Sequence, residues 1–155
     1  MTPSEPKGEM HILMADGAAR GNPGPAAYGF VLRAPSGETV AEAGAALGRT
    51  TNNVAEYEGL LAGLRRALDL GVSRLLVRLD SELVVRQMNG VYRVKNAGLK
   101  PLFERARTLE RQFAAVKFEH VRREANWRAD ELANEALDAQ AGGNVGSQTG
   151  DRGRP

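Results

Sequence analysis

The stretch TNNVAEYEGLLAGLRRALDLGVSRLLVRLD, residues 51–80, decides the fold class. It opens with the polar triplet TNN, which is typical of a helix cap, and its apolar side chains then recur at helical spacing as far as Gly71. This spacing predicts a helix over 54–70. A short apolar run, Val72–Leu79, follows and ends at Asp80, a pattern that is typical of a buried strand. A helix that leads into a buried strand indicates an α/β protein.

Further strands and helices are expected on both sides of this stretch, in the order β-β-β-α-β-α-α-β-α, which predicts a mixed sheet with helices on its faces. The expected strands are Met10–Asp16, Tyr28–Arg33, Glu38–Ala45 and Ala115–Val121, and the other expected helices cover 81–89, 99–113 and 127–139. The segment GAARGNPGP (17–25) is interpreted as a loop. One domain is therefore expected over 10–140, with a loose N-terminal tail (1–9) and a Gly-rich flexible tail or linker (141–155).

The composition excludes several kinds of site. With no Cys and only two His, the chain cannot form disulfides, Cys-ligated zinc sites or iron–sulfur clusters, and any metal is expected to be hard and oxygen-bound. No apolar run approaches the roughly 18 residues of a membrane span, and no secretory signal is expected. Two glycine-containing segments, GAARGNPGP and GAALGRT, fit neither the dinucleotide-binding motif nor the P-loop.

The charge is unevenly distributed along the chain. The net charge is +2 overall, but residues 86–128 carry +7 and lie between acidic flanks. Such a segment suggests a polyanionic partner. The alternative is a solvated, Arg-rich helix surface without a binding role.

Four acids stand at the positions where strands and helices begin or end. Asp16 and Asp80 each end an apolar strand, and Glu56 and Asp130 are each expected in the first turn of a helix. If the two strands are neighbours, the acids can meet at one edge of the sheet, where open α/β sheets bind ligands. Four carboxylates at one place would repel unless a divalent cation joined them. The alternatives are that the helical acids only complement helix dipoles and that the strand acids only cap strand ends.

Four stretches resemble the type 1 class of ribonuclease H: DGAARGNPGPAAYGF (16–30), TNNVAEYEGLLAGL (51–64), LDSELVVRQMNG (79–90) and HVRREANWRADELANEAL (120–137). They occur in the family's order and cover nearly all of 10–140. The resemblance implies a ribonuclease H-like fold, with a five-stranded mixed sheet flanked by helices. It also implies hydrolysis of the RNA strand of an RNA–DNA hybrid. The family's Asp-Glu-Asp-Asp active site falls on Asp16, Glu56, Asp80 and Asp130.

The resemblance further implies that these four residues bind two Mg²⁺ ions, with Mn²⁺ as a possible substitute and Asp16 as the bridging ligand. One ion would activate the attacking water and the other would stabilise the leaving 3′ oxygen. The expected products carry 5′-phosphate and 3′-hydroxyl ends.

Contacts to the hybrid are implied in the same way. Asn22, Asn52 and Asn53 match positions that face the minor groove, where amides can meet the 2′-hydroxyl groups of the RNA strand. A second set resembles a pocket that holds a phosphate of the DNA strand, namely Arg49, Thr51 and Asn96. For the TNN segment the alternative is plain helix capping, and for Arg49 it is a solvated loop charge.

The chain departs from the family's pattern at two places. The basic helical protrusion of many members is missing, and only GVYRVKNAGLK (90–100) joins the helices there, so Tyr92, Arg93 and Lys95 are candidates for a partial replacement. The loop before the last helix lacks the His that some members carry, and Glu124 occupies roughly that position. His120 is interpreted as a strand residue and Trp127 as packing beneath the last helix.

Taken together, the sequence predicts a monomeric, metal-dependent ribonuclease H that acts in the cytoplasm on RNA–DNA hybrids, without a membrane or protein partner. One alternative is a hybrid-binding module without catalysis. Another is a nuclease or strand-transfer enzyme of the same fold. Four acids near a polyanion argue against a module that only binds, because they would repel the phosphates.

Overall fold

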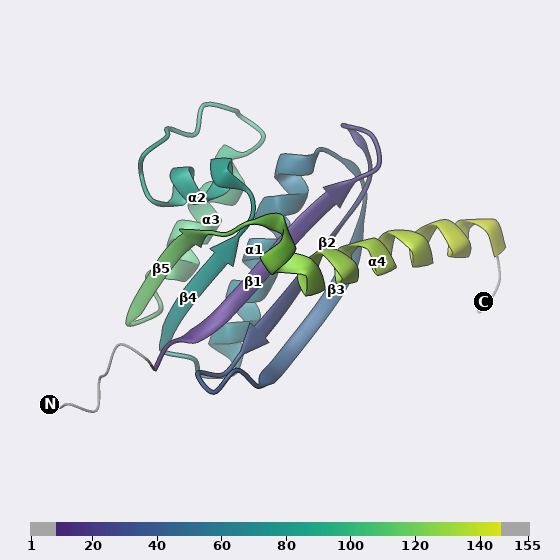
Figure 1. The fold of residues 1–155 in the computed structure, drawn as a ribbon. Coiled ribbons are helices and arrows are strands. Elements are labelled where there is room, and N and C mark those ends of the chain that lie inside the picture. The colour runs from purple at the N-terminus through teal and green to yellow at the C-terminus, as the bar shows by residue number, and fades with distance from the viewer. Residues whose placement is uncertain (1–8, 147–155) are drawn as a thin grey trace, which may run out of the picture.

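Five strands form one mixed sheet in the computed structural model, which describes residues 9–146 (Figure 1). Antiparallel pairing joins β1 to β2 and β2 to β3, whereas β1, β4 and β5 run parallel, and the strand order is β3-β2-β1-β4-β5. The strands are β1 (His11–Ala19), β2 (Gly24–Arg33), β3 (Thr39–Thr50), β4 (Arg74–Leu79) and β5 (Ala115–His120). The mixed five-stranded sheet expected from the sequence is confirmed.

Helices cover both faces of this sheet. The first three lie together on one face and the last helix crosses the other, as Figure 1 shows. The helices are α1 (Asn52–Asp69), α2 (Glu82–Met88), α3 (Lys100–Glu110) and α4 (Trp127–Gly146), and a single 3₁₀ turn, η2 (Arg123–Asn126), precedes α4. None of the helices in the described part of the chain is long and apolar enough to cross a membrane.

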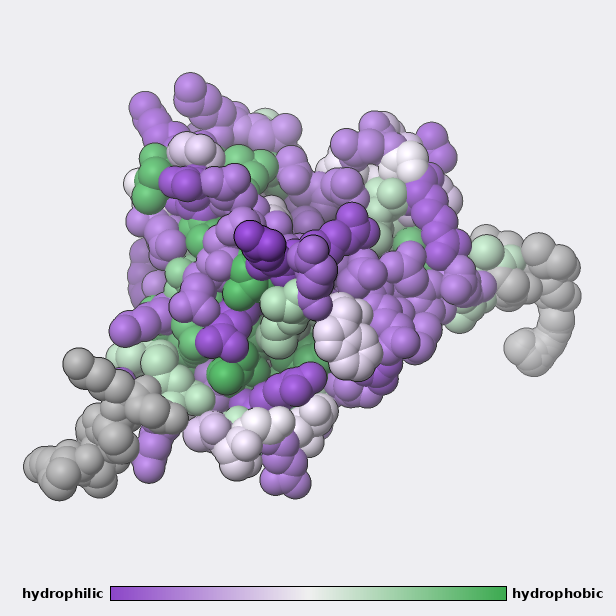
Figure 2. All heavy atoms as spheres, in the orientation of Figure 1, coloured by the Kyte–Doolittle hydropathy of each residue, from purple (hydrophilic) through white to green (hydrophobic). Residues whose placement is uncertain are grey.

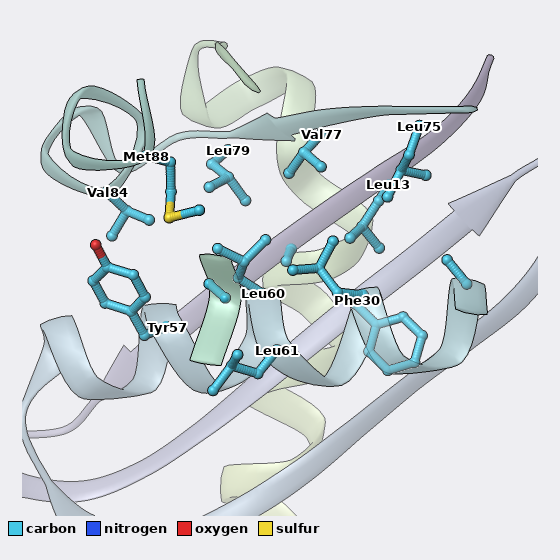
Figure 3. Packing of buried hydrophobic residues seen from close by; sticks show 14 of the residues in the cluster. Leu13, Phe30, Tyr57, Leu60, Leu61, Leu75, Val77, Leu79, Val84 and Met88 are labelled. Atoms are coloured by element: carbon cyan, nitrogen blue, oxygen red, sulfur yellow. The ribbon is translucent and has the colours of Figure 1, made fainter. Parts of the chain in front are cut away.

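The main core lies between α1 and the strands (Figure 3). Leu13 of β1 and Leu75 of β4 are fully buried against α1, which contributes Leu60 and Leu64. Each such leucine stabilises the fold by roughly 1.5–3 kcal/mol through burial. Tyr57 is also fully buried, and its hydroxyl donates a 2.6 Å hydrogen bond to a side-chain oxygen of α2. The core therefore fixes the start of α1 against the carboxyl ends of β1 and β4.

The opposite face depends on glycine. A Cβ atom on Gly29 of β2 would lie 2.3 Å from the carbonyl oxygen of Ala129, and one on Gly44 of β3 would lie 2.5 Å from the carbonyl oxygen of Leu132. The backbone of α4 can therefore approach the sheet closely because these two positions carry no side chain. This helix packs over β2, β3 and β1, and Figure 2 shows apolar side chains among the polar ones over β1 and β4 beside it.

Several boundaries differ from those expected. The strand that was expected to end at Asp16 continues to Ala19, because antiparallel pairing with β2 extends to the pair Ala19 and Ala26. The expected loop therefore shrinks to residues 20–23. Likewise α4 continues from its expected end at 139 to Gly146, since each residue added to an existing helix gains a hydrogen bond.

The expectation for Trp127 is wrong. This residue begins α4 and its side chain is 60% exposed, because the helix packs on the sheet through the small face that contains Ala129 and Ala133. The two expected tails lie largely outside the described residues, which begin at 9 and end at 146.

Candidate active site

Close contact between β1 and α1 brings Glu56 next to Asp16. A Cβ atom on Gly17 would lie 2.3 Å from the backbone of Ala55 and Glu56, so only glycine allows the helix to begin this close to the strand. The backbone N–H of Gly17 donates a 3.0 Å hydrogen bond to Oε1 of Glu56. Glu56 lies beyond the first turn of α1, in which the structure has no acid, so the helix dipole does not account for its position.

Strand register places Asp80 beside the same point. Ala15 of β1 pairs with Leu79, the last residue of β4, so the residues that follow them, Asp16 and Asp80, leave the parallel ladder side by side. Ser81 then caps α2 by accepting a hydrogen bond from the N–H of Val84. The chain turns away at this cap and leaves the Asp80 carboxylate at the edge of the sheet.

The fourth acid arrives from the other face. Asp16 pairs across the ladder with Gly29, the residue over which α4 makes its close approach at Ala129. Asp130 follows in the first turn of α4 and lines the same hollow as Asp16, whose pKa its negative charge helps to raise. The side-chain amide of Asn134 donates to the backbone oxygen and to Oδ1 of Asp130, at 3.0 and 3.3 Å. The structure thus brings together all four acids that the sequence singled out.

The electrostatics of this cluster are unfavourable without a cation. Carboxylate oxygens of Asp16, Glu56 and Asp80 lie within 4.8 Å of one another. Burial, followed by repulsion from Glu56, Asp80 and Asp130, raises the pKa of Asp16 to about 9. Burial and repulsion from Asp80 raise the pKa of Glu56 to about 8, although the hydrogen bond from Gly17 opposes the shift. The cluster therefore needs protons or a positive ion at neutral pH.

The acids line a hollow of about 220 Å³ together with Asn52 and Arg123. Arg123 is 78% exposed, and its guanidinium nitrogen lies 3.6 Å from Oδ1 of Asp130. The sequence drew attention to Glu124 in this loop, but Glu124 is exposed and Arg123 faces the acids instead. No spacing along the chain could have singled out Arg123, because it lies in a 3₁₀ turn and not in the helix that carries Asp130.

The residues expected to contact a hybrid fall into two groups. Around the start of α1, Oδ1 of Asn22 accepts a 3.0 Å hydrogen bond from the N–H of Asn52, and Thr51 caps the helix by accepting from Val54. Arg49 and Asn53 are exposed on either side of this cap.

Asn96 belongs to a different segment, the loop before α3. Its Oδ1 accepts hydrogen bonds from the N–H groups of Gly98 and Leu99, at 2.7 and 3.2 Å, so its side chain orders the loop. Within the described residues Asn96 has no hydrogen bond to Arg49 or Thr51.

The loop that replaces the basic protrusion forms a second hollow, of about 650 Å³, between α2 and α3. Its lining includes Tyr92, Arg93, Lys95 and Lys100. Tyr92 is 46% exposed, and the guanidinium of Arg86 lies 5.5 Å from the centre of its ring. The lining thus contains three cationic side chains, one acid (Glu104) and two aromatic rings, those of Tyr92 and Phe103, a combination that can meet a nucleic-acid backbone.

Comparisons with known proteins agree with this geometry. Residues 14–136 match the family described as reverse transcriptase-like. The chain is 47% identical over 131 residues to a ribonuclease HI of Halobacterium salinarum, covering 84% of this chain and 65% of that protein. It is 50% identical over 131 residues to a bifunctional protein of Mycobacterium tuberculosis, but it spans only 36% of that protein's length.

Solved structures extend the likeness to three dimensions. The N-terminal RNase H domain of the mycobacterial protein superposes with a TM-score of 0.84 at 46% identity, covering 88% of this chain and 99% of that domain. LC11-RNase H1, solved in complex with an RNA/DNA hybrid, superposes with a TM-score of 0.81 at 45% identity, covering 84% of this chain and 99% of that chain. These matches confirm the resemblance seen in the sequence, and the chain belongs to the type 1 ribonuclease H family.

Proposed function

We propose that this chain is a metal-dependent endoribonuclease that hydrolyses the RNA strand of RNA–DNA hybrids and leaves 5′-phosphate and 3′-hydroxyl ends. The observation that carries the proposal is the convergence of Asp16, Glu56, Asp80 and Asp130 on one hollow. The burial of Asp16 and the raised pKa values of Asp16 and Glu56 make this arrangement costly unless a cation is bound. Membership of the family supports the same activity.

The residues present fit a hard divalent cation. All the candidate ligands are carboxylate oxygens, which Mg²⁺ and Mn²⁺ prefer, and neither Cys nor His lines the hollow. Asp16 is surrounded by the other three acids, so it is the candidate to be shared between two ions. When bound, such ions promote attack by water on the phosphodiester and stabilise the charge of the leaving oxygen.

The protein groups supply position and charge. Gly17 and Asn134 hold Glu56 and Asp130 through hydrogen bonds, so these carboxylates need little reorganisation when the substrate arrives. Arg123 stands at the rim of the hollow with an exposed guanidinium, which can turn from Asp130 toward a phosphate oxygen. Its positive charge also opposes the rise in the pKa of Glu56.

Recognition of the hybrid is proposed to use the polar start of α1 and the cationic loop. The side chain of Asn52 faces the hollow, and the amide groups of Asn22 and Asn53 are exposed beside it. Such amides can bind 2′-hydroxyl groups, which distinguish RNA from DNA. Arg93 and Lys95 would contact backbone phosphates. A single chain contributes all four acids, so we propose that it acts as a monomer. We also propose that it acts in the cytoplasm.

The experiment compares cleavage of a labelled RNA–DNA hybrid, duplex DNA and duplex RNA, with and without Mg²⁺. Cleavage of the hybrid's RNA strand alone, and only with the metal, supports the proposal. Hybrid binding without cleavage in Mg²⁺ or Mn²⁺ would identify a binding module, and cleavage of duplex DNA would identify another nuclease of this fold. Asp69→Asn, at an exposed acid that ends α1, is the matched control for variants at the four acids.

A further inference from the structure

Asn126 is one of three buried polar residues among those that the structure describes, and its side chain has no assigned role in the reaction. It ends η2, directly before α4, and is 1% exposed. Its side-chain nitrogen donates a 2.8 Å hydrogen bond to the backbone oxygen of Ala15 and a 3.4 Å hydrogen bond to Oδ1 of Asp80. One amide therefore connects the residue before Asp16 to the carboxylate of Asp80.

The orientation of this amide is determined by its surroundings. Its nitrogen faces two oxygen atoms, whereas its own oxygen, Oδ1, is buried and has no hydrogen-bond partner in the described part of the chain. Rotating the amide by half a turn would place Oδ1 against both oxygens and remove both hydrogen bonds. The side chain thus acts here only as a donor, and both of its acceptors belong to the site.

Asn126 also links three separate segments. It contacts the end of the parallel ladder on β1, the residue that follows β4, and, through the main chain, the first turn of α4. Asp130 lies four residues after it, about one helical turn away. Loss of the amide would therefore free Asp80 to change its orientation and would loosen the junction that carries Asp130.

We propose that Asn126 is a positioning residue, whose buried amide sets the orientation of the Asp80 carboxylate and its distance from Asp16 for binding of divalent cations. This inference rests on the proposed function, because it assumes that the acids bind the ions. Partners of this kind, which hold a ligand without touching the metal, typically change metal affinity or activity by roughly 10–100-fold when removed. Since Asn126 is buried, it should not contribute to binding of the hybrid.

The test compares wild type, Asn126→Ala and Asn89→Ala. Asn89 also donates a side-chain hydrogen bond to a backbone oxygen, that of Phe118, but it contacts none of the acids. Two quantities are measured for each protein: the Mg²⁺ concentration for half saturation, by titration calorimetry, and the melting temperature with and without Mg²⁺. We expect Asn126→Ala to need about 10-fold more Mg²⁺ or greater, and to lose most of the metal-induced rise in melting temperature. Asn89→Ala should keep both.

Kinetics provide the second readout. In Asn126→Ala at saturating Mg²⁺, kcat for hybrid cleavage should fall by roughly 10-fold or more, while KM for the hybrid changes by less than about 2-fold. If Asn126→Ala does not fold, the test is made on the wild-type protein instead, by following the side-chain amide signals of Asn126 in NMR spectra during a titration with Mg²⁺. These signals should shift at the Mg²⁺ concentration that saturates the site, while those of Asn89 stay constant, and unchanged Asn126 signals would overturn the proposal.

The outcomes separate this inference from the proposed function. If Asn126→Ala melts at a lower temperature but keeps the wild-type Mg²⁺ affinity and kcat, the residue is only structural and the inference is wrong, while the proposed function stands. If wild type itself neither binds Mg²⁺ nor cleaves the hybrid, both are wrong.

Discussion

The metal-free protein should become more stable when Asp16 loses its charge. Asp16 is 4% exposed, and burial together with three neighbouring acids raises its pKa to about 9 in the folded state, far above its ordinary value of 3.8. A group with a raised pKa contributes stability that is fully present below about pH 4 and is lost as the pH rises toward 9. The variant Asp16→Asn removes this loss, since the amide needs no proton.

The magnitude follows from proton linkage. One proton held by the folded but not by the unfolded chain changes the free energy of unfolding by about 1.36 kcal/mol per pH unit. Between pH 5 and pH 8 this gives about 4 kcal/mol as an upper limit, and relaxation of the site would reduce it to roughly half. In a chain of 155 residues, roughly 2–4 kcal/mol corresponds to a rise in melting temperature of about 4–16 °C.

The assay is thermal unfolding followed by circular dichroism in EDTA at pH 5, 6.5 and 8, for wild type, Asp16→Asn and the control Asp69→Asn. The melting temperature of Asp16→Asn should exceed that of wild type by an amount that grows with pH, and added Mg²⁺ should stabilise wild type more than the variant. If Asp16→Asn is no more stable than wild type at pH 8, or if the difference is the same at pH 5 and pH 8, the reasoning about this cluster is wrong.

Four further predictions concern activity and packing. Asp80→Asn should be nearly inactive but still bind the hybrid in a filter-binding assay, because the phosphate and groove contacts remain; substantial Mg²⁺-dependent cleavage would contradict the assignment. Mg²⁺ or Mn²⁺ should support cleavage and the larger Ca²⁺ should not, whereas full activity after exhaustive EDTA treatment would exclude a metal requirement. The double variant Arg93→Ala and Lys95→Ala should raise KM for the hybrid more than it lowers kcat. Binding measured at two salt concentrations should also depend less steeply on salt, by about one unit of log–log slope for each phosphate contact that is lost. Gly29→Ala should lower the free energy of unfolding by roughly 1–3 kcal/mol in a urea titration, because its Cβ would collide with the backbone of α4, and an unchanged midpoint would show that the helix can shift without cost.

Much of the fold could be predicted because its elements carry strong local patterns. The helix that begins after Thr51 has a cap and a regular apolar stripe, and the strand that ends at Leu79 is a short apolar run between turn signals. Local pattern could not determine where β1 ends. Residues 17–19 are Gly-Ala-Ala, which have no strand preference, and they are extended only because β2 continues to pair with them.

The candidate site could be predicted in its acids but not in the groups that hold them. The sequence pattern predicted the four acids near the ends of strands and helices, and the resemblance to a family supplied their convergence. Gly17, Gly29 and Asn126 act through contacts between segments that are distant in the sequence, so no spacing along the chain reveals them. The sequence drew attention to Glu124 because it matches the position of the family's loop His, whereas the structure places its neighbour Arg123 beside Asp130.

The place of Asp16 in the sheet explains how a charge is tolerated in the middle of a strand. Parallel pairing with β4 stops at Ala15, whereas antiparallel pairing with β2 continues for four more residues. From Asp16 onward β1 therefore has only one neighbouring strand, and its open edge faces the residues that follow β4. The hollow lined by the acids opens beside this edge, and the amide of Asn126 caps the last carbonyl of the ladder. A longer β4 would pair with β1 beyond Ala15, close this opening with backbone hydrogen bonds and bury the acids where no cation could reach them. The proposed chemistry therefore requires a short β4 as much as it requires the acids themselves.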